Sequence, residues 1–210
     1  MGLKHRYEER VLPVALDKIC GSKGFAPHRR ATLARTHGTV LEIGFGSGTN
    51  LAHYPPEVER VLAVEPSGRA VDLAAERIAR TRFPVEVIGL DGEHLPLGAA
   101  SVDCVVSTFT LCTVPHVEQA TAEIRRVLRP GGTLHVLEHG LDDAPDVQRW
   151  QRRLDPLQQA IAGGCHLTRH VPSLVEAAGL RWVEVHRWRE GHPYTYTSMT
   201  RGVAAVAANP

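Results

Sequence analysis

The sequence predicts an α/β fold of the doubly wound kind, with a mostly parallel sheet and an antiparallel hairpin at its C-terminal end. Three observations predict it. Short apolar runs alternate with stretches of helical periodicity, which is typical of parallel sheets covered by helices on both faces. A glycine-rich segment directly follows the first apolar run, as a tight turn at the end of a buried strand would. The last runs alternate apolar and polar residues, which favours an antiparallel pair at one edge.

The elements follow one another in a regular order. Residues 4–36 are expected to be helical, with breaks near Pro13 and across the stretch from Gly21 to Pro27. Helices are also expected over 67–80 and 116–128, and the segment Arg129-Pro130-Gly131-Gly132 is expected to be a turn. Buried strands are predicted at 40–43, 60–65 (RVLAVE), 85–90 (VEVIGL), 102–107 (VDCVVS) and 133–138 (TLHVLE). The terminal hairpin is predicted from 181–190 and 194–206, around the turn Gly191-His192-Pro193.

Length and composition predict one domain, 1–210, because 210 residues with 43% hydrophobic and 22% charged residues are ordinary globular values. The formal net charge is +1, from 24 basic and 23 acidic residues, so neither nucleic acid nor an anionic membrane is an expected partner. No apolar run approaches the ~18 residues that span a bilayer, and the charged N-terminus contains no signal-peptide stretch, so a cytoplasmic location is expected. A monomer and a homodimer both remain open.

The strongest local pattern is the run Glu42-Ile43-Gly44-Phe45-Gly46-Ser47-Gly48-Thr49-Asn50. Glycines at a strand-to-helix turn let the backbone pass close to a ligand, and the N–H groups of a following helix would face it. The dinucleotide-binding fingerprint places its third glycine at the position that Thr49 occupies here. The tighter spacing suits a ligand without a pyrophosphate. It disfavours a NAD-binding reductase, as does the absence of a Tyr-x-x-x-Lys pair.

Two carboxylates follow the next two predicted strands. Glu65 closes the second strand, where an acidic side chain can accept hydrogen bonds from a ribose diol. Asp91 closes the third, where it can accept a bond from an adenine amino group while the Gly92 backbone approaches the ring. The alternatives are a solvated carboxylate for Glu65 and a turn-forming Asp-Gly pair for Asp91. The presence of both carboxylates argues against a non-catalytic scaffold.

Five ordered segments resemble the motifs of class I S-adenosylmethionine (SAM)-dependent methyltransferases: LEIGFGSG, AVEPS, GLDGEHLPL, SVDCVVSTFTLCTV and RRVLRPGGTLHVLEHG. They are most similar to the type-11 branch, which includes ubiquinone- and menaquinone-ring methyltransferases. The resemblance implies a Rossmann-like sheet of seven strands with the last hairpin reversed, and SAM as the cofactor. It also implies glycines beside the methionine part of SAM, Glu65 at the ribose, Asp91 at the adenine, and Ser107–Thr108 beneath the sulfonium. The residues expected to hold SAM are Glu42, Gly44, Gly46, Gly48, Asn50, Glu65, Pro66, Asp91, Gly92, Ser107 and Thr108.

Beyond residue 140 the sequence resembles a smaller set within that branch, which includes the alkyl-thiol methyltransferases of animal microsomes. Those proteins carry an N-terminal membrane-associating segment, for which this sequence shows no counterpart, and this disfavours a lipophilic thiol acceptor. Residues 1–36 are expected to form a helical cap, and 141–172 a lid over the acceptor site. The segment 142–169 is rich in Arg, Gln, Asp and His, which favours a small polar acceptor.

The expected reaction is therefore O-methylation of a small molecule, such as a sugar, by in-line displacement, with S-methylation of a thiol as the alternative. A hydroxyl acceptor needs a general base, and histidine is the natural one at neutral pH. His139 is the first candidate, because it follows the fifth strand at the edge of the sheet where ligands bind. His166, after the double glycine Gly163-Gly164, is the second.

No metal site is predicted. Glu138, His139, Asp142 and Asp143 could ligate a hard cation such as Mg²⁺, but an acidic loop of this kind is usually solvated. The cysteines show no C-x-x-C spacing and are expected to be free thiols, mostly buried: Cys20, Cys104, Cys112 and Cys165. A nucleic-acid methyltransferase is disfavoured because no Asn/Asp-Pro-Pro-Tyr pattern follows the fourth strand.

Overall fold

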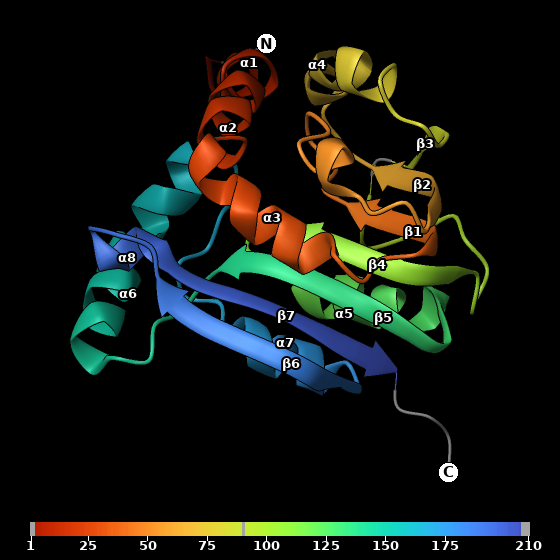
Figure 1. Ribbon diagram of the computed structural model, residues 1–210. Coiled ribbons are helices and arrows are strands. Elements are labelled where there is room, and N and C mark those ends of the chain that lie inside the picture. Colours follow the sequence, from red (N-terminus) through yellow and green to blue (C-terminus); the bar gives the residue numbers. More distant parts are fainter. Residues whose placement is uncertain (1–2, 90, 207–210) are drawn as a thin grey trace.

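A computed structural model describes residues 3–89 and 91–206, and its centre is one seven-stranded sheet in the order β3-β2-β1-β4-β5-β7-β6 (Figure 1). β1 to β5 run parallel to one another, and β7 runs antiparallel to both β5 and β6. The predicted α/β class and the reversed C-terminal hairpin are therefore confirmed. The strands are β1 (Gly38–Ile43), β2 (Val58–Val64), β3 (Val85–Gly89), β4 (Val102–Thr108), β5 (Leu128–His139), β6 (Leu180–Arg189) and β7 (Ser198–Val206).

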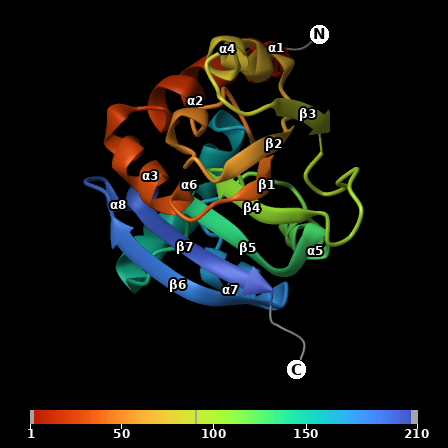
Figure 2. The same cartoon turned by 45° about the vertical axis from the view of Figure 1, so that its right-hand side comes forward.

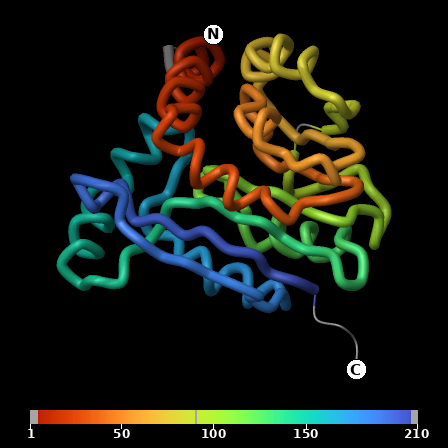
Figure 3. Tube along the Cα trace, in the orientation of Figure 1, coloured from red at the N-terminus to blue at the C-terminus, as the bar shows by residue number. Residues whose placement is uncertain are grey.

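Helices cover both faces of this sheet. In Figures 1 and 2, α3 crosses one face, and α5 and α7 lie against the other. The tube trace shows the chain running from α1, beside α4, to α3 at the middle of the sheet (Figure 3). The helices are α1 (Leu3–Arg10), α2 (Leu12–Cys20), α3 (Ala26–Leu33), α4 (Gly68–Ile78), α5 (Val117–Val127), α6 (Pro145–Ile161), α7 (Val171–Ala177) and α8 (Tyr194–Thr197), with short 3₁₀ turns η1 (Lys23–Phe25) and η2 (Leu51–His53).

Alternation along the buried strands produces two apolar cores. On β1, Val40 joins the core that contains Leu33 of α3 and Ala74 of α4. Leu41 and Ile43 belong to the other core, with residues of α5 and α7. Successive side chains of a strand point to opposite faces, so a strand that is apolar at nearly every position is covered on both sides.

The connection from β1 to β2 departs from the expected strand–helix–strand order. All of residues 44–57 are described, and they contain only the 3₁₀ turn η2 where a helix was expected. Three glycines with positive φ occupy the start of this connection, and Pro55-Pro56 lies near its end. Glycine and proline both oppose an α-helix, which explains the difference.

Several boundaries also differ from expectation. The first helical break falls at Val11, and Pro13 lies in the first turn of α2, where its missing N–H costs little. Residues 129–132 lie within β5, at a register shift against β4, instead of forming a separate turn. Residues 194–197 form α8, so β7 begins only at Ser198.

Leu90, the expected end of the third strand, lies outside the described residues, as do residues 1–2 and 207–210 of the expected domain. Within the described ranges, no helix combines the length and apolarity needed to cross a bilayer.

Candidate functional site

The glycine loop after β1 has two glycines packed against protein, Gly44 and Gly48, and one, Gly46, that faces open space. Gly44, Gly46 and Gly48 have φ values of 67°, 58° and 73°, which favour glycine. A Cβ atom on Gly44 would lie 2.0 Å from Thr110 Oγ1, so this residue packs against the loop after β4. A Cβ atom on Gly46 would meet nothing nearer than the Gly44 carbonyl at 3.9 Å. The backbone at Gly46 is therefore open to a ligand.

Glu65, which follows β2, is bonded to this loop. Its Oε2 accepts from the Gly46 N–H at 2.7 Å, and its Oε1 accepts from the Ser67 N–H, beyond Pro66, at 2.9 Å. Each carboxylate oxygen keeps a further lone pair for a ligand. Burial raises the pKa of Glu65, against the effect of these two backbone donors.

Glu42 and Asn50 belong to a buried hydrogen-bond network beneath the loop. Glu42 accepts from Asn50 Nδ2 at 2.9 Å and from the Tyr54 hydroxyl at 2.6 Å. Arg29 of α3 donates to Asn50 Oδ1 at 2.6 Å and to Thr108 Oγ1 at 3.2 Å. Burial raises the pKa of Glu42 to about 7. Both Glu42 oxygens are thus used within the protein, where they position the loop.

The N-terminal helices touch the same loop and the end of β4. Asp17 of α2 accepts from Ser47 Oγ at 2.5 Å and from Arg77 of α4 at 2.7 Å. Phe109, directly after β4, has φ +57°, a conformation that costs free energy in a bulky residue. Its ring meets Phe25 edge-on at 5.0 Å and lies 5.5 Å from the Arg29 guanidinium carbon. The segment from α2 to α3 therefore packs beside the glycine loop.

Asp91 is exposed, unlike Glu65. It accepts from the Glu93 N–H at 2.7 Å and lies 2.9 Å from His94 Nδ1, a hydrogen bond that lowers the Asp91 pKa. A Cβ on Gly92 would lie 2.8 Å from Ile43 Cγ2, so this turn reaches the end of β1.

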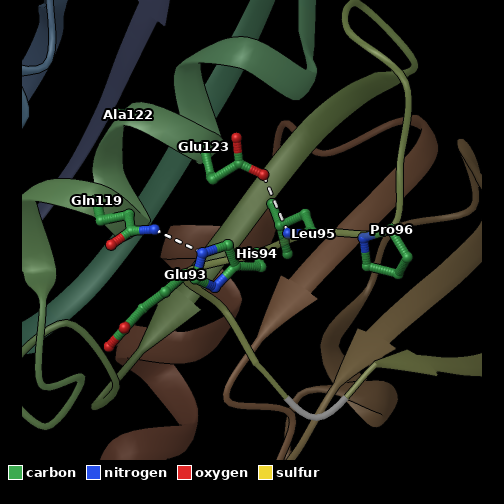
Figure 4. A pocket seen from close by; sticks show the side chains of 7 residues that line it. All are labelled: Glu93, His94, Leu95, Pro96, Gln119, Ala122 and Glu123. Atoms are coloured by element: carbon green, nitrogen blue, oxygen red, sulfur yellow. Dashed lines mark hydrogen bonds between the residues drawn. The ribbon is translucent and has the colours of Figure 1, made fainter.

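Figure 4 shows a hollow between the segment after Asp91 and α5, where His94 meets Gln119 and the Leu95 N–H donates to Glu123. Its lining includes none of the residues expected to hold SAM. It is therefore a feature beside the expected adenine position, separate from the glycine loop.

Glu138 anchors the loop after β4. It accepts from Ser107 Oγ at 2.7 Å, from the Thr110 N–H at 2.9 and 3.0 Å, and from the Leu111 N–H at 3.0 Å. Burial raises the pKa of Glu138, while these donors oppose the rise. Ser107 is thus committed to Glu138, so its role beneath a ligand would be to fix the position of the neighbouring backbone.

His139 meets two cysteines from distant segments. Its Nε2 lies 2.7 Å from Cys165 Sγ, and Cys165 Sγ lies 3.4 Å from Cys112 Sγ. Both thiols are buried and reduced, as expected for these cysteines. Burial lowers the pKa of His139, but the neighbouring Cys165 and the nearby carboxylates outweigh it, and the net shift is upward. The His139 Nδ1 atom is buried and finds no hydrogen-bond partner among the described residues.

His166, the second histidine candidate, points to a different neighbour. Its Nδ1 lies 3.4 Å from Asp155 Oδ2, and its backbone N–H donates to the Cys112 carbonyl at 2.7 Å. It supports the loop that carries Cys165.

The four residues considered for a hard cation do not converge. Glu138 binds backbone amides, Asp142 binds Arg189 at 2.6 and 2.8 Å, and Asp143 pairs with Arg187. In the described part of the chain, the one group of three or more such side chains able to hold a metal is Cys112, His139 and Cys165, whose ligating atoms all lie within 4.8 Å of one another.

Sequence reasoning missed Arg29, and it missed the convergence of Cys112 and Cys165 on His139. Arg29 lies in an ordinary helical stretch, and the cysteines are separated by 53 positions without a spacing motif. The sequence contains one signal of a sharp turn that brings Cys165 to this place, namely the double glycine Gly163-Gly164 before it. Both glycines adopt positive φ.

Comparisons with known proteins identify relatives of this chain. A family model described as a methyltransferase domain matches residues 41–136. Thiol S-methyltransferase TMT1A of Homo sapiens is 31% identical over 168 residues, covering 75% of this chain and 68% of that protein. Thiol S-methyltransferase TMT1B of Rattus norvegicus is 32% identical over 151 residues, covering 70% of this chain but only 62% of that protein, so less than two thirds of its length is matched. The solved structure of a geranyl diphosphate methyltransferase in complex with GPP and sinefungin superposes with a TM-score of 0.68 at 14% identity, over 88% of this chain and 77% of that one, which supports the fold.

The chain belongs to the class I SAM-dependent methyltransferases, in the type-11 methyltransferase-domain family.

Proposed function

We propose that this enzyme transfers the methyl group of SAM to a thiol, so that the product is a thioether. The observation that carries this proposal is the similarity to thiol S-methyltransferases over 70% and 75% of the chain. The relatives therefore favour the thiol alternative over the hydroxyl acceptor that the polar composition of residues 142–169 suggested.

The residues available to hold SAM fit the proposal. The open backbone at Gly46 and the free lone pairs of Glu65 would take the methionine part and the ribose, and Asp91–Gly92 the adenine. Glu42, Asn50 and Ser107 would not contact SAM themselves. They would act indirectly, by holding the glycine loop and the end of β4 in position. We further propose that 1–36 cap the SAM site and that 141–172 form a lid over the acceptor, because Asp17 and Arg29 reach the loop from α2 and α3, and Arg169 donates to the Leu111 carbonyl at 2.5 Å.

A thiol acceptor suits the acceptor side of this site. SAM supplies an electrophilic methyl group on a sulfonium, and the acceptor sulfur must lie in line with it, ~3 Å away. A thiol has a pKa near 8.5, so it needs less base assistance than a hydroxyl. This matters because the His139 Nε2 atom is occupied by Cys165, 2.7 Å away, and is not free to act on a hydroxyl. His166 is paired with Asp155 and would act only as support.

The test is transfer of labelled methyl from SAM to a panel of alkyl thiols, phenols, quinols and sugars. We expect label in thioether products only. Glu65→Ala should lower transfer through weaker SAM binding, whereas Glu59→Ala, on the exposed side of β2, should transfer at the wild-type rate. Label on a sugar or phenol oxygen, with none on any thiol, would overturn the proposal.

A further inference from the structure

We propose that Cys112, His139 and Cys165 form a Zn²⁺ site whose fourth coordination position takes the acceptor thiol. This inference rests on the proposed thiol acceptor, but the metal site itself can be measured independently of any methyl transfer.

Three segments far apart in the chain supply the ligands. Cys112 lies in the loop after β4, His139 ends β5, and Cys165 follows the double glycine after α6. Their ligating atoms lie within 4.8 Å of one another, with 3.4 Å between the sulfurs and 2.7 Å between His139 Nε2 and Cys165 Sγ. Tetrahedral Zn²⁺ with such ligands holds their atoms about 3.5–3.8 Å apart, so the pairs need to open by only about 1 Å or less.

The ligand set matches a catalytic site better than a structural one. Two thiolates and one imidazole are soft to borderline donors, which suit Zn²⁺ and do not suit Mg²⁺. No fourth His, Cys, Asp or Glu of the described residues joins the group, and zinc with three protein ligands keeps a position for water or substrate. With His139 Nε2 as the ligand, the imidazole proton is on Nδ1, which is buried and has no partner within the described chain.

The cluster is also connected to the glycine loop through the loop after β4. Thr110 contacts Gly44, its amide donates to Glu138, and Cys112 is two residues further along the same loop. His139 is the residue after Glu138. An ion held here would therefore be close to the expected position of the sulfonium.

The chemistry balances without an oxidant or reductant. When Zn²⁺ binds, the Cys112 and Cys165 thiols release their two protons to solvent. An acceptor thiol that binds the fourth position loses its proton to solvent too, because coordination to zinc deprotonates a thiol outright. The acceptor sulfur then forms a bond to the methyl carbon as the sulfonium–carbon bond breaks, giving a thioether and S-adenosylhomocysteine. His139 acts as a ligand in this scheme, and no general base is needed.

The first test is metal binding by the purified, phosphine-reduced protein, with Zn²⁺ and with Co²⁺ as a spectroscopic probe. We expect one equivalent per chain, with thiolate-to-Co²⁺ charge-transfer absorption and visible bands of a tetrahedral ion. Cys112→Ser, Cys165→Ser and His139→Asn should each weaken binding by about 100-fold or more, since even outer-shell changes cost 10–100-fold. Cys104→Ser, a buried cysteine on β4 outside the cluster, should bind as the wild type does.

A second measurement uses the unaltered protein, so its result does not depend on whether any variant folds. Zn²⁺ should protect Cys112 and Cys165, located by mass spectrometry, from alkylation by iodoacetamide under conditions that label them in the metal-free protein. No stoichiometric binding, or oxidation of this pair to a disulfide in the presence of Zn²⁺, would overturn the site.

The third test separates the metal inference from the proposed function. Adding a monothiol such as 2-mercaptoethanol to the Co²⁺ protein should strengthen the charge-transfer band, as an additional thiolate enters the fourth position. An unchanged spectrum would overturn the acceptor role of the metal. Thiol methylation at an undiminished rate by rigorously metal-free protein would also overturn it, yet leave the proposed function standing. Methylation of a hydroxyl compound alone would remove the proposed function, while the Co²⁺ spectrum would still report the ion.

Discussion

Single side chains near the glycine loop differ in how much hydrogen-bonding capacity they leave for a ligand. Glu65 is the clearest example, because it accepts two backbone hydrogen bonds and retains free lone pairs. Glu42 is the opposite case, with both oxygens used internally. Substitutions at these two carboxylates should therefore have different effects.

Glu65→Ala should weaken SAM binding by about 1–3 kcal/mol, because a charge-assisted acceptor and the support of Gly46 are both lost. Asp91→Ala should fall in the same range if Asp91 meets the adenine. Calorimetric titration with SAM measures both, with Glu59→Ala as the matched control. Wild-type affinity in both variants would refute the assignment of these carboxylates to the SAM site.

Gly44→Ala should destabilise the fold by about 1–3 kcal/mol, because φ is +67° and the new Cβ would collide with the Thr110 side chain. Gly98→Ala is the control, since a Cβ added there would meet no atom within 4 Å and its φ is not positive. Urea unfolding measures the two free energies. Equal values would mean that the loop adjusts at no cost.

Glu42 should make stability depend on pH. Its pKa is about 7 in the folded protein, above its ordinary value of 4.5, so its contribution is fully present below pH 4.5 and lost as pH rises through 7. The groups around it are Arg29, Tyr54, Asn50 and Glu65. Relative to Glu42→Gln, the wild type should lose stability with a slope of up to about 1.4 kcal/mol per pH unit between pH 5 and 7. Denaturant unfolding of both proteins at pH 5, 6, 7 and 8 gives this difference, and a pH-independent difference would contradict it.

Among the elements, the junction of β5, α6 and the β6–β7 hairpin depends on Asp142. Its buried carboxylate accepts two bonds from Arg189 of β6, one from Ser198 at the start of β7, and one from the Ala144 N–H before α6. Arg189 holds the pKa of Asp142 far below its ordinary value. One side chain therefore links four segments.

Asp142→Ala should cost about 2–4 kcal/mol of unfolding free energy, because Arg189, Ser198 and the Ala144 amide all lose a partner. Asp143→Ala is a matched neighbour, an exposed carboxylate in one ion pair with Arg187, and should cost less than about 1 kcal/mol. Thermal or urea unfolding compares them. The Asp142 contribution should also disappear as pH falls below the ordinary carboxyl range, because its folded pKa is depressed.

At the scale of the whole molecule, ligand binding should increase the free energy of unfolding. SAM at one hundred times its Kd should raise the unfolding free energy by about 2.7 kcal/mol, which corresponds to a Tm rise of about 5–10 °C for a chain of this size. NAD at the same concentration should leave Tm unchanged. Differential scanning calorimetry makes the comparison, and a rise with NAD would reopen the reductase alternative.

The strands and the SAM motifs were predictable because both are encoded locally. Short strands with an apolar centre, such as 104–106 within 102–107, are typical of burial between two helical layers, and the glycines and Glu65 mark the ends of neighbouring strands. Tertiary contacts were not predictable in this way. Arg29 reaches Asn50 and Thr108, 21 and 79 positions away, and His139 meets a cysteine 26 positions away. Such groups are brought together by packing, which leaves no spacing pattern in the sequence.

The short η2 turn in place of a helix after β1 has a consequence for which ligands the loop accepts. A full α-helix would present about half a positive charge at its N-terminus, directed at whatever the glycines bind. Three residues of 3₁₀ helix supply little of that field. The loop therefore attracts a diphosphate less than the helix N-terminus of a nucleotide-cofactor site would. It also repels a positively charged sulfur less than such a helix N-terminus would. The absence of a helix in residues 44–57, every one of which is described, thus removes a helix-terminus field that would favour an anion over a cation at this loop.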